Sequence, residues 1–170
     1  TSAGTSNLFL SFDMNKPQAG WQNLSALPQT TSHAVLVSNG KCVYLAGGRT
    51  KTDSGISDFY DTLYEFKISK GIWSKKTKLP YAICAGTGML IDSKNILLFG
   101  GDKGETFHKV ETLLAEISRE TNPIKKQELI VKKNEIQSSH PGFSNEVLDY
   151  TIKSDCWNTI NKIPFPTPVT

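Results

Sequence analysis

The sequence has 170 residues, which is enough for one domain with a sizeable hydrophobic core. Hydrophobic residues make up 38% and charged residues 21%, and the net charge of +3 comes from 19 basic and 16 acidic residues. These values are ordinary for a globular protein, and no run of about 18 apolar residues predicts a membrane-spanning helix. We therefore expect neither a nucleic-acid partner nor a membrane partner.

A repeated pattern organises the chain. Each of three tryptophans is followed seven residues later by a proline, and Leu or Ile precedes that proline; the pairs are Trp21–Pro28, Trp73–Pro80 and Trp157–Pro164. Upstream of each tryptophan lies a short apolar segment, in which a polar turn residue precedes an aromatic residue by five positions; these segments are residues 7–12, 61–66 and 145–150. Self-similarity of this kind predicts repeated structural units.

Residues 29–80 form the complete unit and predict four antiparallel strands, at residues 33–37, 42–46, 62–68 and 72–77. Asn39-Gly40 between the first two strands is typical of a tight hairpin turn. Glycine pairs end two β-rich runs, at residues 47–48 and 100–101, where we expect close backbone packing. The three tryptophans are predicted to be core residues that neighbouring units share, and none is proposed as a ligand platform.

The third unit contains an insertion. Trp21 and Trp73 are 52 residues apart, whereas Trp73 and Trp157 are 84 apart, and the excess lies between the second and third strands. Apolar residues at spacings of three and four predict a helix over residues 105–120. Asn122 and Pro123 then predict the cap and first residue of a second helix, over residues 124–137.

These repeats resemble Kelch repeats, whose units run to about 50 residues. The resemblance implies an all-β fold: a Kelch β-propeller fragment of about two and a half four-stranded blades, from a six-bladed propeller, with a helical hairpin insertion at residues 105–138. We expect the helices to fold back on the rim or mouth. The predicted divisions are a half blade (7–28), a full blade (29–80), a full blade with the insertion (81–165) and the start of another blade (166–170).

An open arc of blades would leave strand edges without partners and an apolar blade face exposed, which closed propellers avoid. We therefore expect a complementary polypeptide that completes the propeller. A product of a cut precursor, a separately encoded half and a second copy of this chain all remain open as its source.

The helical insertion followed by His-Pro-Gly-Phe-Ser-Asn-Glu-Val-Leu-Asp-Tyr, residues 140–150, resembles the sialic acid mutarotase (N-acetylneuraminate epimerase) family, in its cyclically permuted branch. The resemblance implies interconversion of sialic acid anomers by general acid–base catalysis, without a cofactor or metal, and a periplasmic location. A noncatalytic Kelch module that binds a protein or a glycan is the alternative function.

The family's catalytic pattern, Gly-Glu-x-x-x-Gly-x-Arg, is implied in the blade after the inserted one. The chain's single Gly-Glu pair, Gly104-Glu105, is not followed by the rest of that pattern. No catalytic residue is therefore assigned in this chain. The catalytic Glu and Arg are expected on the complementary portion, and the isolated chain is expected to be inactive.

Loops that join second to third strands, and each blade to the next, emerge on one face of a propeller. Candidate substrate-binding residues in these loops are Arg49, Asp53, Asp102, Glu105 and His108. Arg49 could bind the sugar carboxylate, and the others could supply polar contacts. Each has a structural alternative: a surface role for Arg49, turn chemistry for Asp53, and helix capping or solvation for the other three.

The remaining histidines and the cysteines are assigned structural roles. His33 is predicted to be a satisfied core residue of the first strand, and His140 to belong to the turn with Pro141 and Gly142. Three cysteines without a paired motif predict buried thiols rather than metal ligands or nucleophiles; they are Cys42, Cys84 and Cys156.

Overall fold

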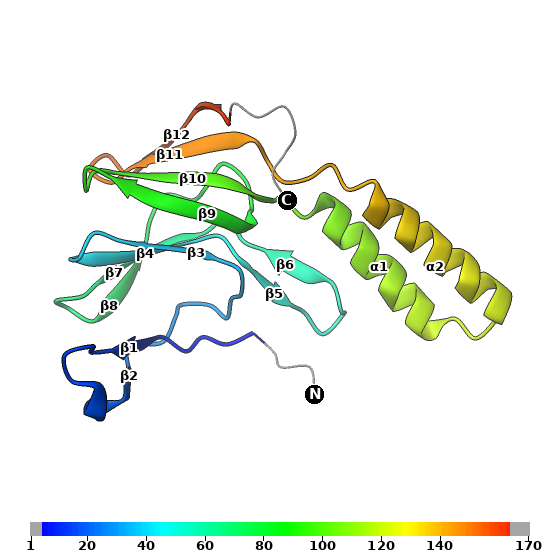
Figure 1. The fold of residues 1–170 in the computed structure, drawn as a ribbon, viewed down its shortest axis with the longest axis horizontal. Helices are drawn as coiled ribbons and strands as arrows, with labels where there is room; N and C mark the ends of the chain where they lie inside the picture. Colours follow the sequence, from blue (N-terminus) through cyan, green and yellow to red (C-terminus); the bar gives the residue numbers. More distant parts are fainter. Residues whose placement is uncertain (1–4, 164–170) are drawn as a thin grey trace.

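The computed structural model describes residues 5–163, which form three stacked antiparallel sheets, one short hairpin and a pair of helices (Figure 1). The two larger sheets have the strand orders β3-β4-β7-β8 and β9-β10-β11-β12, and β1-β2 and β5-β6 each form a two-stranded sheet. In chain order the elements are β1 (Leu10–Phe12), the 3-10 helix η1 (Pro17–Ala19), β2 (Trp21–Asn23), β3 (Val35–Ser38), β4 (Cys42–Ala46), β5 (Arg49–Lys51), β6 (Ser57–Phe59), β7 (Leu63–Lys67), β8 (Ile72–Lys75), β9 (Cys84–Ile91), β10 (Asn95–Asp102), α1 (Glu105–Arg119), α2 (Pro123–Ser138), β11 (Glu146–Thr151) and β12 (Cys156–Lys162).

The three stacked sheets repeat one pattern of contacts. In each, an aromatic residue of the third blade strand pairs with the tryptophan of the fourth, and the ring centroids lie 5.3, 5.0 and 4.9 Å apart for Phe12–Trp21, Phe66–Trp73 and Tyr150–Trp157. The residue before each repeated proline donates its backbone N–H to the carbonyl oxygen of the polar residue that precedes the third strand. The distances are 2.8, 2.8 and 2.7 Å for Leu27–Asn7, Leu79–Asp61 and Ile163–Asn145. The sheets are therefore successive blades, and β1–β2 is the outer half of one.

The main core lies between the two complete blades. Its fully buried members come from four of their strands and the segment that connects the blades; they are Tyr44, Leu63, Leu79, Ile96, Leu98, Leu148 and Tyr150. The inner strands β3 and β9 approach closely, because Gly88 has no side chain: a Cβ there would lie 2.7 Å from Val35 Cγ1. Burial of apolar area at this joint is the main stabilising contribution to the stack.

Buried polar groups at the same joint are paired. Tyr44 donates its hydroxyl to Glu65 at 2.9 Å, and burial followed by this bond raises the pKa of Tyr44. Tyr150 donates to Asp155 at 2.7 Å, and the N–H of Thr77 donates to the same carboxylate at 2.9 Å. Such pairing removes the cost of burying these groups without partners.

The glycine pairs lie where the expected close approach occurs. Gly48 has a φ of 96°, in the left-handed region, and a Cβ there would lie 2.2 Å from Thr31 Oγ1 and 2.9 Å from Ala34 Cβ. Any larger residue would force the blade away from the preceding connection.

The helices lie close to their predicted limits. Asn122 caps α2, because its side chain accepts hydrogen bonds from the N–H groups of Ile124 and Lys125 at 3.0 and 3.2 Å. The expectation that the helices fold back on the blades is wrong: only the first turns of α1 contact the β5–β6 hairpin, and the rest of the pair extends away from the sheets (Figure 1). Neither helix is long and apolar enough to cross a membrane.

Several local predictions are corrected. The first strand of the complete blade begins at Val35, because His33 adopts a left-handed φ of 55° and is exposed, so it is not a core histidine. Residues 49–59 form a β-hairpin instead of an irregular loop. The predicted start of another blade, residues 166–170, lies outside the described residues.

Two predictions of burial are also wrong. Trp21 is 68% exposed, whereas Trp73 and Trp157 are half-buried. Cys84 is a buried free thiol, but Cys42 is only half-buried and Cys156 is exposed. Trp21 and Cys156 share one cause: the first and last described strands, β2 and β12 among them, border no further blade among residues 5–163.

Candidate functional site

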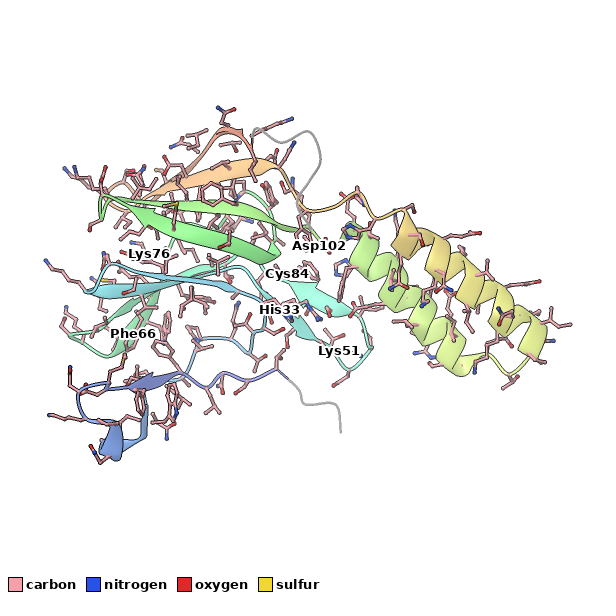
Figure 2. The ribbon with its side chains drawn as sticks, viewed as in Figure 1. His33, Lys51, Phe66, Lys76, Cys84 and Asp102 are labelled. Carbon is pink, nitrogen blue, oxygen red and sulfur yellow. The ribbon has the colours of Figure 1, made fainter. Side chains whose placement is uncertain are left out.

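Four segments meet at one end of the sheets, beside the start of α1. Figure 2 shows Cys84 and Asp102 near α1, and His33 and Lys51 at the same end beside β5. The glycine pairs turn the chain here, so the residues that follow them, Arg49 and Asp102, start the two segments that build the site.

Arg49 is held by a chain of hydrogen bonds that crosses from β5 to α1. Its Nη1 donates to Ser57 Oγ at 2.8 Å, and the Ser57 hydroxyl donates in turn to Glu111 Oε1 at 2.8 Å. The backbone N–H of Ser57 donates to the other oxygen of Glu111 at 2.7 Å. Both carboxylate oxygens of Glu111 therefore bond to the buried Ser57. Arg49 is linked to Glu111 through Ser57 and not by a bond of its own.

Aromatic groups from α1 complete this environment. The guanidinium carbon of Arg49 lies 4.5 Å from the ring centroid of Phe107, in a cation–π contact. His108 Nε2 lies 2.9 Å from the carbonyl oxygen of Ser57, so the bond requires a proton on Nε2 and leaves Nδ1 as the acceptor of a neutral ring. Phe59 packs against both rings, with centroid separations of 5.5 and 4.9 Å.

Asp102 organises the neighbouring turn. Its Oδ1 accepts the N–H of Gly104 at 2.7 Å, and Oδ2 lies 3.8 Å from His140 Nε2. Because His140 Nδ1 accepts the N–H of Gly142 at 2.9 Å, the neutral ring carries its proton on Nε2, toward Asp102. The pair therefore links the end of β10 to the segment that follows α2.

Two clefts open at this end of the molecule. One, of about 350 Å³, lies between α1 and the segment before β11, and its lining includes Asp102, Lys103, Glu105, His140, Asn145 and Glu146. The other, of about 730 Å³, lies along β5, and its lining includes Thr31, Ser32, His33, Arg49, Lys51 and Asp53. Their polar linings suit a hydroxylated ligand better than an apolar one.

A lysine and a glutamate form an ion pair at the first cleft. Lys103 Nζ lies 2.7 Å from Glu146 Oε2 and 3.8 Å from the ring centroid of Tyr81. The bond from Lys103, supported by one from Tyr81, lowers the pKa of Glu146. Burial and then Glu146 raise the pKa of Tyr81 to about 12. Burial, and then Asp102, likewise raise the pKa of Cys84 to about 12, which excludes it as a thiolate nucleophile near neutral pH.

Comparison with known proteins assigns the family. A model of the N-acetylneuraminate epimerase family matches residues 2–169. The chain belongs to the N-acetylneuraminate epimerase family. The N-acetylneuraminate epimerase of Vibrio vulnificus (strain YJ016) is 22% identical over 161 residues, which is 92% of this chain and 42% of the relative. That of Vibrio cholerae (serotype O1, strain El Tor Inaba N16961) is 21% identical over 156 residues, 89% of this chain and 41% of the relative.

A solved structure titled "Structure of YjhT" superposes with a TM-score of 0.70 at 16% identity, over 98% of this chain and 47% of that one. The fold is that of a Kelch β-propeller fragment with a helical hairpin, as the repeats predict. The chain spans about two-fifths of the length of the curated epimerases it matches.

Among the candidate residues of this epimerase-family chain, Arg49 and His108 come together through Ser57. Asp102 and Glu105 line the smaller cleft, Asp102 largely enclosed and Glu105 exposed. Asp53 lies exposed at the β5–β6 turn and lines the larger cleft together with Arg49. Their roles toward a substrate stay predictions.

Ser57 and Glu111 were not predicted as site residues from the sequence. A weak signal existed for Glu111: it follows Phe107 by four residues and so shares its helix face. Nothing in the sequence indicated that Ser57, 54 residues earlier, would meet it. Within residues 5–163, no group of three His, Cys, Asp or Glu side chains is placed to hold a metal ion.

Proposed function

We propose that this chain forms part of a mutarotase that interconverts the anomers of sialic acid, and that Arg49 binds the carboxylate of the sugar. Family membership supports the reaction, since the matching relatives are named N-acetylneuraminate epimerases. The assignment of Arg49 as the residue that binds the carboxylate is supported by the groups that surround its side chain.

Most of the side-chain N–H donors of Arg49 have no acceptor among the described residues. A guanidinium has five N–H donors, and within the described residues one of them is used, on Ser57. No carboxylate of the described residues lies within 4.0 Å of its nitrogens. Phe107 and Ser57 fix the plane of the group, which suits bidentate recognition of a carboxylate.

Anomer exchange needs a base for the anomeric hydroxyl proton and an acid for the ring oxygen. Two carboxylates at this end of the sheets are already committed: Glu111 accepts two bonds from Ser57, and Asp102, in the smaller cleft, holds the turn at Gly104. Asp53 lines the cleft of Arg49 but lies exposed at the β5–β6 turn. This commitment supports placing the acid and base on a complementary portion of the propeller, with this chain supplying the carboxylate site.

A repeated joint supports a complementary portion. Trp73 Nε1 donates to the carbonyl of Ser25 at 3.1 Å, and Trp157 Nε1 donates to that of Thr77 at 2.9 Å. In both joints the acceptor lies four residues after the tryptophan of the preceding blade. Trp21 occupies the equivalent position and is 68% exposed, so it suits a joint with a further blade.

The test uses a complete propeller polypeptide that contains this chain, with anomer exchange of N-acetylneuraminate followed by proton NMR. Arg49→Ala should raise KM about tenfold to a hundredfold, since hydrogen bonds to a charged group contribute about 1.5–3 kcal/mol. The sequence's other arginine, Arg119, lies exposed near the end of α1, and Arg119→Ala is the matched control.

The methyl ester of the sugar is used as a second substrate, because it lacks the anionic carboxylate that Arg49 is proposed to bind. Arg49→Ala should change the KM of the acid far more than that of the ester. Equal effects on both would remove Arg49 from the carboxylate site. No acceleration of exchange by a folded complete propeller would favour the alternative of a noncatalytic Kelch module.

A further inference from the structure

Asp102 and His140 face each other at the smaller cleft without forming a hydrogen bond. Asp102 Oδ2 lies 3.8 Å from His140 Nε2, which is too long for a direct hydrogen bond. The other charged pair of this cleft is closed, because Lys103 Nζ lies 2.7 Å from Glu146 Oε2. Among the described residues, Asp102 Oδ2 therefore has no donor and His140 Nε2 has no acceptor within hydrogen-bond distance.

Both side chains are held in place through their other polar atom. Asp102 Oδ1 accepts the backbone N–H of Gly104 at 2.7 Å, and His140 Nδ1 accepts that of Gly142 at 2.9 Å. Because Nδ1 is an acceptor, the ring carries its proton on Nε2, so the pair presents one acceptor and one donor side by side. The side chains of Asp102 and His140 are 14% and 30% exposed, so both are partly enclosed and both can be reached from the cleft.

The gap between this acceptor and this donor fits one hydroxyl oxygen. An oxygen about 2.8 Å from both atoms would donate its proton to Asp102 Oδ2 and accept the proton of His140 Nε2. An ammonium or a carboxylate would satisfy only one of the two atoms, since the first only donates and the second only accepts. The pair therefore favours a group that donates and accepts at once, as the hydroxyl groups of a sugar do.

The segments that carry Asp102 and Arg49 are attached to consecutive residues. Asp102 pairs with Cys84 in the register of β9 and β10. The N–H of Gly48, which precedes Arg49, donates to the carbonyl of Ile83 at 2.8 Å. The two segments therefore lie side by side at the end of the sheets where Figure 2 shows Cys84 and Asp102 beside α1.

We propose that Asp102 and His140 together bind one hydroxyl group of the sugar whose carboxylate Arg49 is proposed to bind. The inference rests on the proposed function for the identity of the sugar. The pair positions the sugar by hydrogen bonding, and the acid and the base of anomer exchange stay on the complementary portion of the propeller.

The first test uses Asp102→Asn in a complete propeller polypeptide that contains this chain. Asparagine keeps an oxygen for the N–H of Gly104 and places an amide NH₂ where Oδ2 was, so the hydroxyl group meets two donors. The dissociation constant of N-acetylneuraminate, measured by isothermal titration calorimetry, should rise about tenfold or more. The matched control is Asp92→Asn, which removes the same charge in the exposed turn between β9 and β10, at a φ of 50° that asparagine tolerates. It should leave the dissociation constant unchanged.

A series of N-acetylneuraminate analogues, each lacking one hydroxyl group, separates hydroxyl binding from a purely structural role of Asp102. One analogue should bind the wild-type propeller about tenfold or more weakly than the parent sugar. Asp102→Asn should change the affinity for that analogue less than about twofold, because the missing hydroxyl and the missing acceptor belong to one contact. Equal weakening of the parent sugar and of every analogue by Asp102→Asn would overturn the inference.

His140 supplies a second measurement, which decides the question if Asp102→Asn does not fold. Long-range ¹H–¹⁵N NMR of the propeller labelled at histidine should show the proton of His140 on Nε2, and saturating N-acetylneuraminate should shift that nitrogen resonance. His140→Asn assigns the resonance and retains an acceptor for the N–H of Gly142. A proton on Nδ1, or an unchanged Nε2 resonance at saturation, would overturn the inference.

The possible results separate this inference from the proposed function. Sugar binding that does not depend on Asp102 would overturn the hydroxyl site and leave the reaction standing. Binding that depends on Asp102, in a propeller that does not accelerate anomer exchange, would support the hydroxyl site and overturn the proposed reaction. No saturable binding of N-acetylneuraminate would overturn both.

Discussion

Trp73 and Trp21 occupy equivalent places in two blades, yet their surroundings differ, and this difference predicts unequal contributions to stability. Trp73 packs against Phe66 and Phe9 with ring centroids 5.0 and 5.1 Å away, and its indole N–H bonds to Ser25. Trp21 contacts one ring, that of Phe12, and is 68% exposed.

Replacing a fully buried tryptophan by alanine costs about 3–5 kcal/mol. Because Trp73 is half-buried, we expect Trp73→Ala to lower the free energy of unfolding by about 2–4 kcal/mol. Trp73→Phe retains most of the packing and loses the hydrogen bond, at about 1 kcal/mol. Trp21→Ala should cost less than about 1 kcal/mol, as surface substitutions do.

Urea unfolding of the chain, followed by far-ultraviolet circular dichroism, measures all three variants without relying on tryptophan fluorescence. The comparison is made at one temperature, in an osmolyte that favours the folded state if the wild-type chain needs it. Equal losses for Trp73→Ala and Trp21→Ala would refute the assignment of Trp73 to a joint between blades.

Three further predictions concern single groups. A thiol-specific alkylating reagent should modify the exposed Cys156 first and leave Cys84 unmodified in the folded chain, as mass mapping would show; modification of Cys84 at the rate of Cys156 would contradict its burial. Although burial opposes it, the hydrogen bonds accepted by Asp155 and a nearby lysine lower its pKa below the usual 3.8. Ionised Asp155 therefore stabilises the fold above that pH, and its contribution is lost as the pH falls through the lowered pKa; Asp155→Asn should flatten this part of a pH–stability curve. Glu111→Ala in the complete propeller should raise KM with little change in kcat, because it frees Arg49 to rotate, and Glu111→Gln should restore most of the affinity; a loss confined to kcat would count against this positioning role.

Much of the fold could be predicted because its signals are local and repeated. The spacing from each tryptophan to its proline, and the aromatic residue opposite each tryptophan, lie within one pair of strands. The limits of α1 and α2 followed from apolar spacing and from the Asn122-Pro123 cap, which act within a few residues.

The parts that were missed depend on distant partners. The burial of Trp21 was predicted by analogy with the other two, but burial requires a neighbouring blade. Likewise, the link from Ser57 to Glu111 joins residues 54 positions apart, across an insertion whose direction no periodicity fixes. The helical pair has apolar residues on its outer face as well, including Ile124, so its pattern could not indicate which side would contact the blades.

The most direct test of the account measures anomer exchange of N-acetylneuraminate by proton NMR, with this chain alone and with a complete propeller polypeptide that contains it. We predict acceleration by the complete propeller, a weaker apparent affinity with Arg49→Ala, and no acceleration by the folded chain alone. Acceleration by the chain alone would contradict the placement of the catalytic groups, and a folded complete propeller that leaves the spontaneous rate unchanged would contradict the proposed function itself.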